Sequence, residues 1–138
     1  MFGTHVHDGK QILVVEDHPE SVDLLQMILE NAGYRVRSAE TGRQALRAVA
    51  AASADRNSDF HPDLILLDLR LPDMNGVDVV RELQKSHSEI PPVILLSADP
   101  PQSLEEAARS VGARAVRKPF DFDELFQAVE GALNKAMA

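Results

Sequence analysis

The sequence predicts an α/β fold, in which a parallel five-stranded sheet is covered by helices on both faces. Short aliphatic runs recur along the chain, and they are continuous rather than alternating, which is typical of strands buried on both faces. Between these runs the apolar residues recur with the period of a helix, so strand and helix alternate five times. Helical crossovers of this length connect strands that run parallel.

The predicted strands differ in how deeply they are buried. Four aliphatic runs, at residues 12–15, 64–67, 93–96 and, more weakly, 113–116, are expected in the interior of the sheet. Residues 34–37 alternate apolar and polar side chains, which favours an edge strand with one wetter face.

Five segments with helical periodicity follow the strands, at residues 19–32, 41–52, 76–86, 103–111 and 121–135. Thr41 is a suitable N-cap for the second helix. Gly33 and Gly112 follow the last apolar residues of the first and fourth helices, where glycine commonly ends a helix. The polar residues 53–60 predict a surface loop. Residues 1–9 and 136–138 are interpreted as terminal tails of one domain spanning 10–135.

Composition narrows the classes of function. The 138-residue chain has a net charge of −8, which argues against nonspecific binding to nucleic acid or to anionic lipid. It has no cysteine, so disulfides and thiolate chemistry are excluded. No apolar run approaches the ~20 residues that span a bilayer, and the N-terminus does not resemble a signal peptide. We therefore expect a soluble cytoplasmic protein without direct membrane or nucleic-acid contact.

Each inner strand is followed by a polar residue of a particular kind. Glu16 and Asp17 follow the first run, Asp68 the second, Ser97 the third and Lys118 the last. In a parallel sheet the carboxyl ends of the strands lie at one edge, where ligands of open α/β sheets bind. We therefore expect these side chains to lie close together.

This set of side chains suits phosphoryl transfer to an aspartate. Clustered carboxylates repel one another, and a hard divalent cation such as Mg²⁺ relieves the repulsion. An ammonium group pairs with a carboxylate or a phosphoryl oxygen, and a hydroxyl donates a hydrogen bond to the same oxygen. A carboxylate oxygen would be the nucleophile, while the other groups neutralise charge. Alone, an aspartate or serine after a strand is usually a turn residue. The joint occurrence at four strand ends favours the functional interpretation.

Four segments of the chain, within residues 10–135, resemble the receiver domain of bacterial two-component response regulators. They are ILVVEDHPE with the acidic pair, PDLILLDLRLPDMNG with Asp68, VILLSAD with Ser97, and VRKPF with Lys118 and Pro119. Each segment alone is a weak signal, and all four in this order and spacing form a strong one.

The resemblance implies a flavodoxin-like (βα)₅ fold with strand order 2-1-3-4-5. It implies that Asp68 accepts a phosphoryl group from a phosphohistidine of a sensor histidine kinase or a histidine phosphotransfer protein. It further implies a Mg²⁺ site formed by Glu16 and/or Asp17, by Asp68 and by the backbone carbonyl of Arg70. The domain would promote only its own phosphorylation and dephosphorylation, and so would not be an enzyme with a separate substrate.

The resemblance also implies a switch. The Lys118–Pro119 bond is expected to be cis, as only bonds before proline readily are. Phosphorylation is expected to draw Ser97 toward the phosphoryl group and to shift a surface within residues 103–134, where a downstream protein would bind.

Several residues depart from the usual receiver pattern. Ala115 stands three residues before the lysine, where the family commonly has an aromatic switch residue, so the usual readout by a rotating ring is in doubt. Arg70, two residues after Asp68, would either shield or pair with the acyl phosphate or be a solvated surface residue. Residues 99–101 (Asp-Pro-Pro) should stiffen a loop that is usually mobile. His18, after the acidic pair, is interpreted as a tolerated helix-start residue rather than a catalytic base.

Three alternative functions compete with this interpretation. Haloacid-dehalogenase-type phosphatases need a second aspartate two residues after the nucleophile, and position 70 is arginine. A flavin or dinucleotide carrier needs a phosphate-cradling turn, and residues 16–19 (Glu-Asp-His-Pro) lack one. A degenerate receiver that binds partners without phosphate is the main alternative. A stand-alone receiver, a relay intermediate and a receiver of a larger regulator are all compatible with the sequence.

Overall fold

The computed structural model describes residues 9–137, in which five parallel strands alternate with five helices. The strands are β1 Gln11–Val15, β2 Arg35–Ala39, β3 Leu64–Asp68, β4 Val93–Ser97 and β5 Arg114–Arg117. The helices are α1 Pro19–Asn31, α2 Gly42–Ala54, α3 Gly76–Ser86, α4 Pro101–Val111 and α5 Phe122–Met137. The strand order is β2-β1-β3-β4-β5, which confirms the predicted fold.

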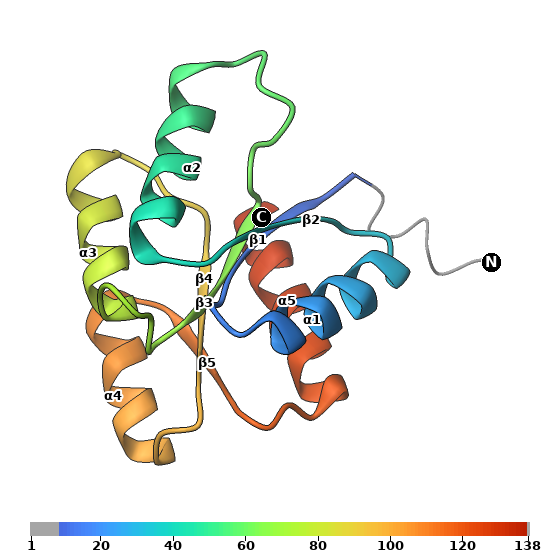
Figure 1. The fold of residues 1–138 in the computed structure, drawn as a ribbon, viewed down its shortest axis with the longest axis vertical. Coiled ribbons are helices and arrows are strands. Elements are labelled where there is room, and N and C mark those ends of the chain that lie inside the picture. The colour runs from blue at the N-terminus through green and yellow to red at the C-terminus, as the bar shows by residue number, and fades with distance from the viewer. Residues whose placement is uncertain (1–8, 138) are drawn as a thin grey trace.

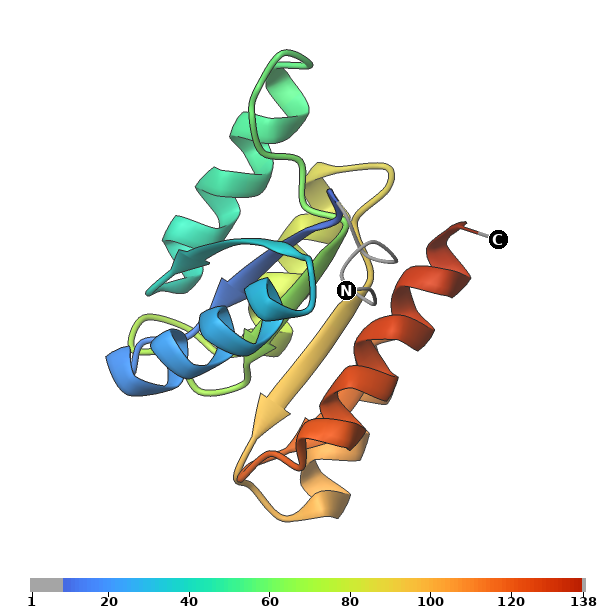
Figure 2. The same ribbon diagram turned by 90° about the vertical axis from the view of Figure 1, so that its right-hand side faces the viewer.

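The helices form two layers around the sheet, with α2, α3 and α4 on one face and α1 and α5 on the other (Figures 1 and 2). Successive residues of a strand point to opposite faces. In β1, Leu13 and Val15 accordingly join the core beneath α2, α3 and α4, whereas Ile12 and Val14 join the core beneath α1 and α5. The continuous aliphatic runs of the sequence therefore supply both cores at once.

Several element boundaries differ from the predicted ones by one or two residues. Helix α4 begins at Pro101 rather than near 103, because proline lacks the N–H that the first helical residue leaves unpaired anyway. Helix α5 continues to Met137, so the predicted boundary at 135 falls inside the helix. The N-terminal tail predicted at 1–9 lies outside the described residues except for Gly9.

The register of the sheet places the ends of β1, β3, β4 and β5 at one edge. Val15 of β1 lies opposite Leu67 of β3, and Asp68 lies opposite Leu96 of β4. The next pair, Ser97 and Arg117, joins β4 to β5. The residues that follow the strands therefore meet at this edge.

Gly76 holds the first turn of α3 against the backbone of β3. Its N–H donates to the carbonyl of Leu69 at 2.8 Å, and a Cβ added here would lie 2.9 Å from the carbonyl oxygen of Asp68. No heavier residue fits this approach without a shift of the backbone that carries Asp68.

We expect Gly76→Ala to lower the free energy of unfolding by ~1–3 kcal/mol, the usual cost of overpacking, as measured by urea denaturation. Gly131→Ala is the matched control, because its Cβ would meet only the flexible guanidinium of Arg114 and alanine favours a helix interior. Equal stability of the two variants would contradict the tight contact at Gly76.

No helix within residues 9–137 is long and apolar enough to cross a membrane.

Candidate functional site

Side chains at the carboxyl ends of three strands meet at one edge of the sheet. Glu16 follows β1, Asp68 ends β3, and Lys118 follows β5. The Lys118 Nζ lies 2.6 Å from Glu16 Oε1 and 3.2 Å from Asp68 Oδ2. The Lys118–Pro119 peptide bond is cis. Two carboxylates from the neighbouring strands β1 and β3 thus share one ammonium group, which reaches them from β5 across the end of β4.

Asp68 is buried, with 4% of its surface exposed. Burial raises the pKa of its carboxyl group, and the nearby charge of Glu16 adds to this effect. The backbone N–H of Arg70, which donates to Asp68 Oδ1 at 3.1 Å, and the Lys118 ammonium act in the opposite direction. Asp68 is therefore a carboxylate whose negative charge is only partly compensated.

Glu16 is fully buried, yet it is held ionised. Burial alone would raise its pKa, but hydrogen bonds from Lys118 and His18 outweigh that effect and lower the pKa to about 2. Burial alone would lower the pKa of Lys118, but its contacts with Glu16 and Asp68 outweigh that effect, so the pKa of Lys118 is raised. The pair is consequently charged over the whole neutral range.

Asp17 and His18 complete a cluster of groups able to ligate a metal. One ligand atom from each of Glu16, Asp17, His18 and Asp68 lies within 4.8 Å of every other. Asp17 Oδ1 is a buried oxygen without a hydrogen-bond partner among the described residues. An unsatisfied carboxylate oxygen beside two further carboxylates fits a divalent cation, because hard cations prefer such oxygens.

Ser97 lies at the end of β4 and is almost fully buried. Its Oγ accepts a hydrogen bond from the backbone N–H of Asp99 at 2.9 Å. The Asp99 carboxylate in turn pairs with Arg70 at 2.6 Å, and the Asp99 carbonyl accepts from Arg117 Nε at 3.3 Å. The loop between β4 and α4 is therefore tied both to Ser97 and to the residue two positions after Asp68.

His18 precedes the first residue of α1, as predicted for a helix-start residue, but its side chain makes no capping hydrogen bond. The ring instead turns toward the acidic pair, with Nδ1 at 3.0 Å from Glu16 Oε2. This contact raises the pKa of His18.

Asp73 has a structural role that sequence reasoning missed. Its carboxylate accepts from the backbone N–H groups of Gly42 and Arg43 at 2.8 and 3.0 Å, at the start of α2. The hydrogen bond from Gly42 lowers the pKa of Asp73. The loop after Asp68 is thereby fixed to a helix 31 residues earlier in the chain. The sequence gives little sign of this role, because Asp73 is simply an aspartate in the loop after Asp68.

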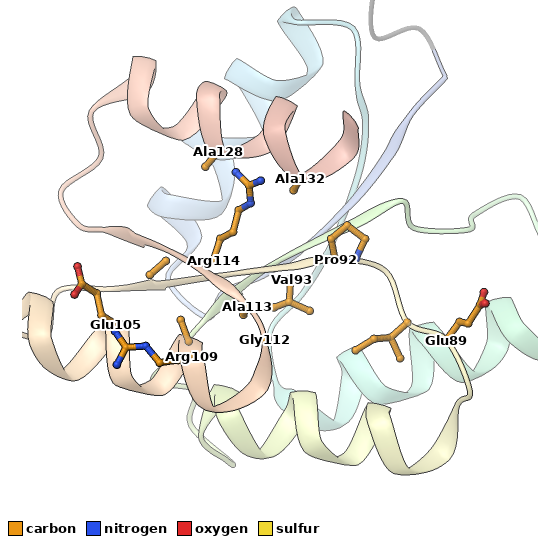
Figure 3. Close-up of a pocket in the computed structure, with 13 residues that line it drawn as sticks. Glu89, Pro92, Val93, Glu105, Arg109, Gly112, Ala113, Arg114, Ala128 and Ala132 are labelled. Carbon is orange, nitrogen blue, oxygen red and sulfur yellow. The ribbon is translucent and has the colours of Figure 1, made fainter. Parts of the chain in front are cut away.

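Ala115 lines an open groove of about 1180 Å³ along β5, between α4 and α5. Small side chains from both helices line it, and Arg114 extends into it toward Ala128 and Ala132 of α5 (Figure 3). The groove also contacts Pro92 at the beginning of β4, so it opens at the edge of the sheet opposite Asp68. It is separate from the carboxylate site.

Residues 12–130 match the family model of the response regulator receiver domain. The chain is 38% identical over 128 residues to the transcriptional regulatory protein KdpE of Mycobacterium tuberculosis, which covers 92% of this chain and 52% of that protein. It is 35% identical over 127 residues to the transcriptional regulatory protein ZraR of Escherichia coli, covering 92% of this chain and 27% of that protein. The chain thus spans between about a quarter and a half of the length of these relatives.

Solved structures show the same fold. The chemotaxis protein CheY4 of Vibrio cholerae matches with a TM-score of 0.73 and 27% identity, over 90% of this chain and 98% of that one. A response regulator receiver domain from Clostridium thermocellum matches with a TM-score of 0.75 and 25% identity, over 91% and 95% of the two chains.

Proposed function

The chain belongs to the response regulator receiver domains of two-component systems, and from this membership we propose that it accepts a phosphoryl group on Asp68. The observation that carries the proposal is the convergence of Lys118 on Glu16 and Asp68 at the carboxyl edge of the sheet. The carboxylate of Asp68 is buried and its charge is only partly compensated, which suits a nucleophile. The ammonium group fixed beside it would stabilise the negative charge that develops on the phosphoryl oxygens.

In the proposed reaction, a carboxylate oxygen of Asp68 bonds to the phosphorus of a phosphohistidine on a partner protein. The bond between phosphorus and the donor imidazole nitrogen breaks, and that nitrogen takes up a proton. Lys118 already lies 3.2 Å from Asp68 Oδ2, so its ammonium is in place to pair with a phosphoryl oxygen. The Ser97 hydroxyl hydrogen is available for donation, since Oγ is the acceptor in its bond with Asp99.

The Mg²⁺ ion would be held by the carboxylates of Asp17, Asp68 and Glu16 and by the backbone carbonyl of Arg70. Bound there, the ion would supply charge neutralisation to phosphoryl oxygens. The unsatisfied Asp17 Oδ1 supports this assignment, because the other carboxylates already accept hydrogen bonds from the protein.

The proposed switch starts at the loop between β4 and α4. A phosphoryl group on Asp68 would compete with Asp99 for Arg70 and would attract the hydroxyl of Ser97. Because both residues are tied to this loop, their movement would shift α4 and the surface within residues 103–134. This route needs no aromatic ring at Ala115. The phosphoryl donor would be a sensor histidine kinase or a histidine phosphotransfer protein. The target would be a protein that binds the shifted surface, and all of these proteins would act in the cytoplasm.

A receiver that signals without phosphate is the second candidate. The observation in its favour is Ala115, which leaves an open groove where a ring is usual. The cluster of Glu16, Asp68 and Lys118 weighs against it, because a binding module has no need of charged groups gathered at a largely buried site.

Intact-protein mass after incubation with acetyl phosphate tests the proposal. We expect the wild type to gain one phosphoryl group in the presence of Mg²⁺, with no gain in EDTA or in Asp68→Ala. Absence of any gain in folded wild-type protein with Mg²⁺ would overturn the proposal and favour the phosphate-independent module.

Arg70 is expected to prolong the lifetime of the acyl phosphate. Its guanidinium lies beside the site and would pair with the added charge, hindering the approach of water. Arg70→Gln should change the free energy of unfolding by less than ~1 kcal/mol, because its ion pair with Asp99 is largely exposed, yet it should shorten the phosphoprotein's half-life severalfold. The decay is followed by intact mass, with Arg81→Gln on the exposed surface of α3 as the control. An unchanged half-life would show that Arg70 is only a surface residue.

A further inference from the structure

His18 places an imidazole at the mouth of the carboxylate site. Its side chain is 69% exposed, and its Nδ1 lies 3.0 Å from Glu16 Oε2 and 3.4 Å from Asp17 Oδ1. The ring makes no hydrogen bond to the first turn of α1, which is the usual task of a residue at this position. The imidazole therefore contacts the acidic pair rather than its own helix, and it remains accessible to an ion from solvent.

The positions of the four donor groups suit a single ion. Two ligand atoms bound to one ion at ~2.1 Å lie at most ~4.2 Å apart. The donor atoms of Glu16, Asp17, His18 and Asp68 lie within 4.8 Å of one another, so small side-chain rotations bring them into range. His18 and Asp17 are the more exposed of these, and Asp17 Oδ1 has no hydrogen bond to give up among the described residues.

The two oxygens of Glu16 face different partners. Oε1 lies 2.6 Å from the ammonium of Lys118, whereas Oε2 faces His18. Oε2 also accepts the backbone N–H groups of Asp17 and His18 at 3.1 and 3.2 Å, so Glu16 is the most occupied of the four donors. An ion on the His18 side would thus rely chiefly on Asp17, Asp68 and the imidazole, and would leave the Lys118–Glu16 contact intact.

We propose that His18 is a metal ligand, which makes the site select a borderline transition-metal ion such as Zn²⁺ over Mg²⁺. The inference rests on the proposed function, since it assigns a further ligand to the same metal site. Imidazole nitrogen suits zinc, nickel and copper, whereas Mg²⁺ prefers oxygen ligands and retains its waters. A carboxylate set with one imidazole therefore favours zinc far more than a set of carboxylates alone.

Isothermal titration calorimetry with Mg²⁺ and Zn²⁺ tests this proposal, in the absence of any phosphoryl donor. All proteins carry His5→Gln and His7→Gln, so that the N-terminal histidines do not contribute. We expect Zn²⁺ to bind at least ~10-fold more tightly than Mg²⁺, and His18→Gln to weaken Zn²⁺ binding by ~10-fold or more while Mg²⁺ affinity changes little. His87→Gln, at the end of α3, is the matched control and should leave both affinities unchanged.

A second readout separates ligation from an indirect effect. On addition of Zn²⁺, the imidazole nitrogen resonances of His18 should shift in ¹⁵N spectra, whereas those of His87 should not. Equal Zn²⁺ affinity in His18→Gln, or unshifted His18 nitrogens in the zinc-bound protein, would overturn the proposal. In either of these cases, Mg²⁺-dependent phosphoryl gain by His18→Gln would leave the proposed function standing. Failure of the wild type to bind Mg²⁺ and to gain a phosphoryl group would overturn the proposed function itself.

Discussion

Replacing Lys118 by methionine will lower the free energy of unfolding by ~3 kcal/mol at neutral pH in metal-free buffer. The substitution keeps the length of the side chain but removes the ammonium that Glu16 and Asp68 share. Glu16 is fully buried and Asp68 nearly so, and a buried charge left without its partner typically costs this much. Urea denaturation measures the effect.

Two controls show whether this loss comes from the buried carboxylates. Lys85→Met removes an ammonium that is 74% exposed and should be nearly neutral. Mg²⁺ should restore much of the stability of Lys118→Met, because a divalent cation bound beside the same carboxylates compensates for the missing positive charge. A Lys118→Met protein as stable as the wild type without metal would contradict the charge balance described for the site.

The contact between Lys118 and Glu16 should also affect how the free energy of unfolding depends on acid pH. Because the pKa of Glu16 is lowered to about 2 in the folded protein, its contribution to stability is complete above its ordinary value of 4.5. That contribution is lost as the pH falls from 4.5 toward 2, where the folded protein must also take up the proton. Lys118→Met should show a smaller loss over this range, since the hydrogen bond and charge by which Lys118 lowers the pKa of Glu16 are gone and only those of His18 remain.

Asp68→Asn will stabilise the metal-free protein at neutral pH. Burial and Glu16 raise the pKa of Asp68, so its ionised form is less favourable in the folded than in the unfolded chain. Asparagine removes this charge, and Lys118 keeps its closer contact with Glu16. We expect a gain of ~1 kcal/mol, which corresponds to a rise of ~4 °C in Tm for a domain of this size.

The pH dependence of this gain distinguishes it from an effect of packing. The destabilisation caused by ionised Asp68 is present in full above its raised pKa. It disappears as the pH falls below the ordinary value of 3.8, because Asp68 is then protonated in both the folded and the unfolded chain. The difference in Tm between Asp68→Asn and the wild type should therefore narrow on acidification. Asp23→Asn, on the exposed surface of α1, is the control variant. A constant difference from neutral to acid pH would contradict the assignment.

The fold and the central residues of the site were predictable because each depends on a local pattern. A buried parallel strand reads as an aliphatic run, and the carboxyl ends of such strands share one edge, so Glu16, Asp68 and Lys118 could be placed together. The start of α4 was predicted two residues late because the prolines were interpreted as loop residues, although Pro101 is a favourable first residue of a helix.

Contacts between loops could not be predicted in the same way. Arg70 meets Asp99 across 29 residues, and Asp73 meets the start of α2 across 31. These pairs depend on how far each loop projects from its strand and on side-chain rotamers, which leave no periodic trace in the sequence. The His18 ring turns toward Glu16 rather than toward its own helix. This orientation also depends on a side-chain rotamer that the sequence pattern does not reveal.

The most direct test of the central claim is to locate the phosphoryl group. The wild type, treated with acetyl phosphate and Mg²⁺, is reduced with borohydride, which converts an aspartyl phosphate to homoserine, and its peptides are sequenced by tandem mass spectrometry. The site described above predicts homoserine at position 68 and aspartate at position 17. A modification at any other residue, or an unmodified Asp68 in protein that has gained the mass of a phosphoryl group, would contradict it.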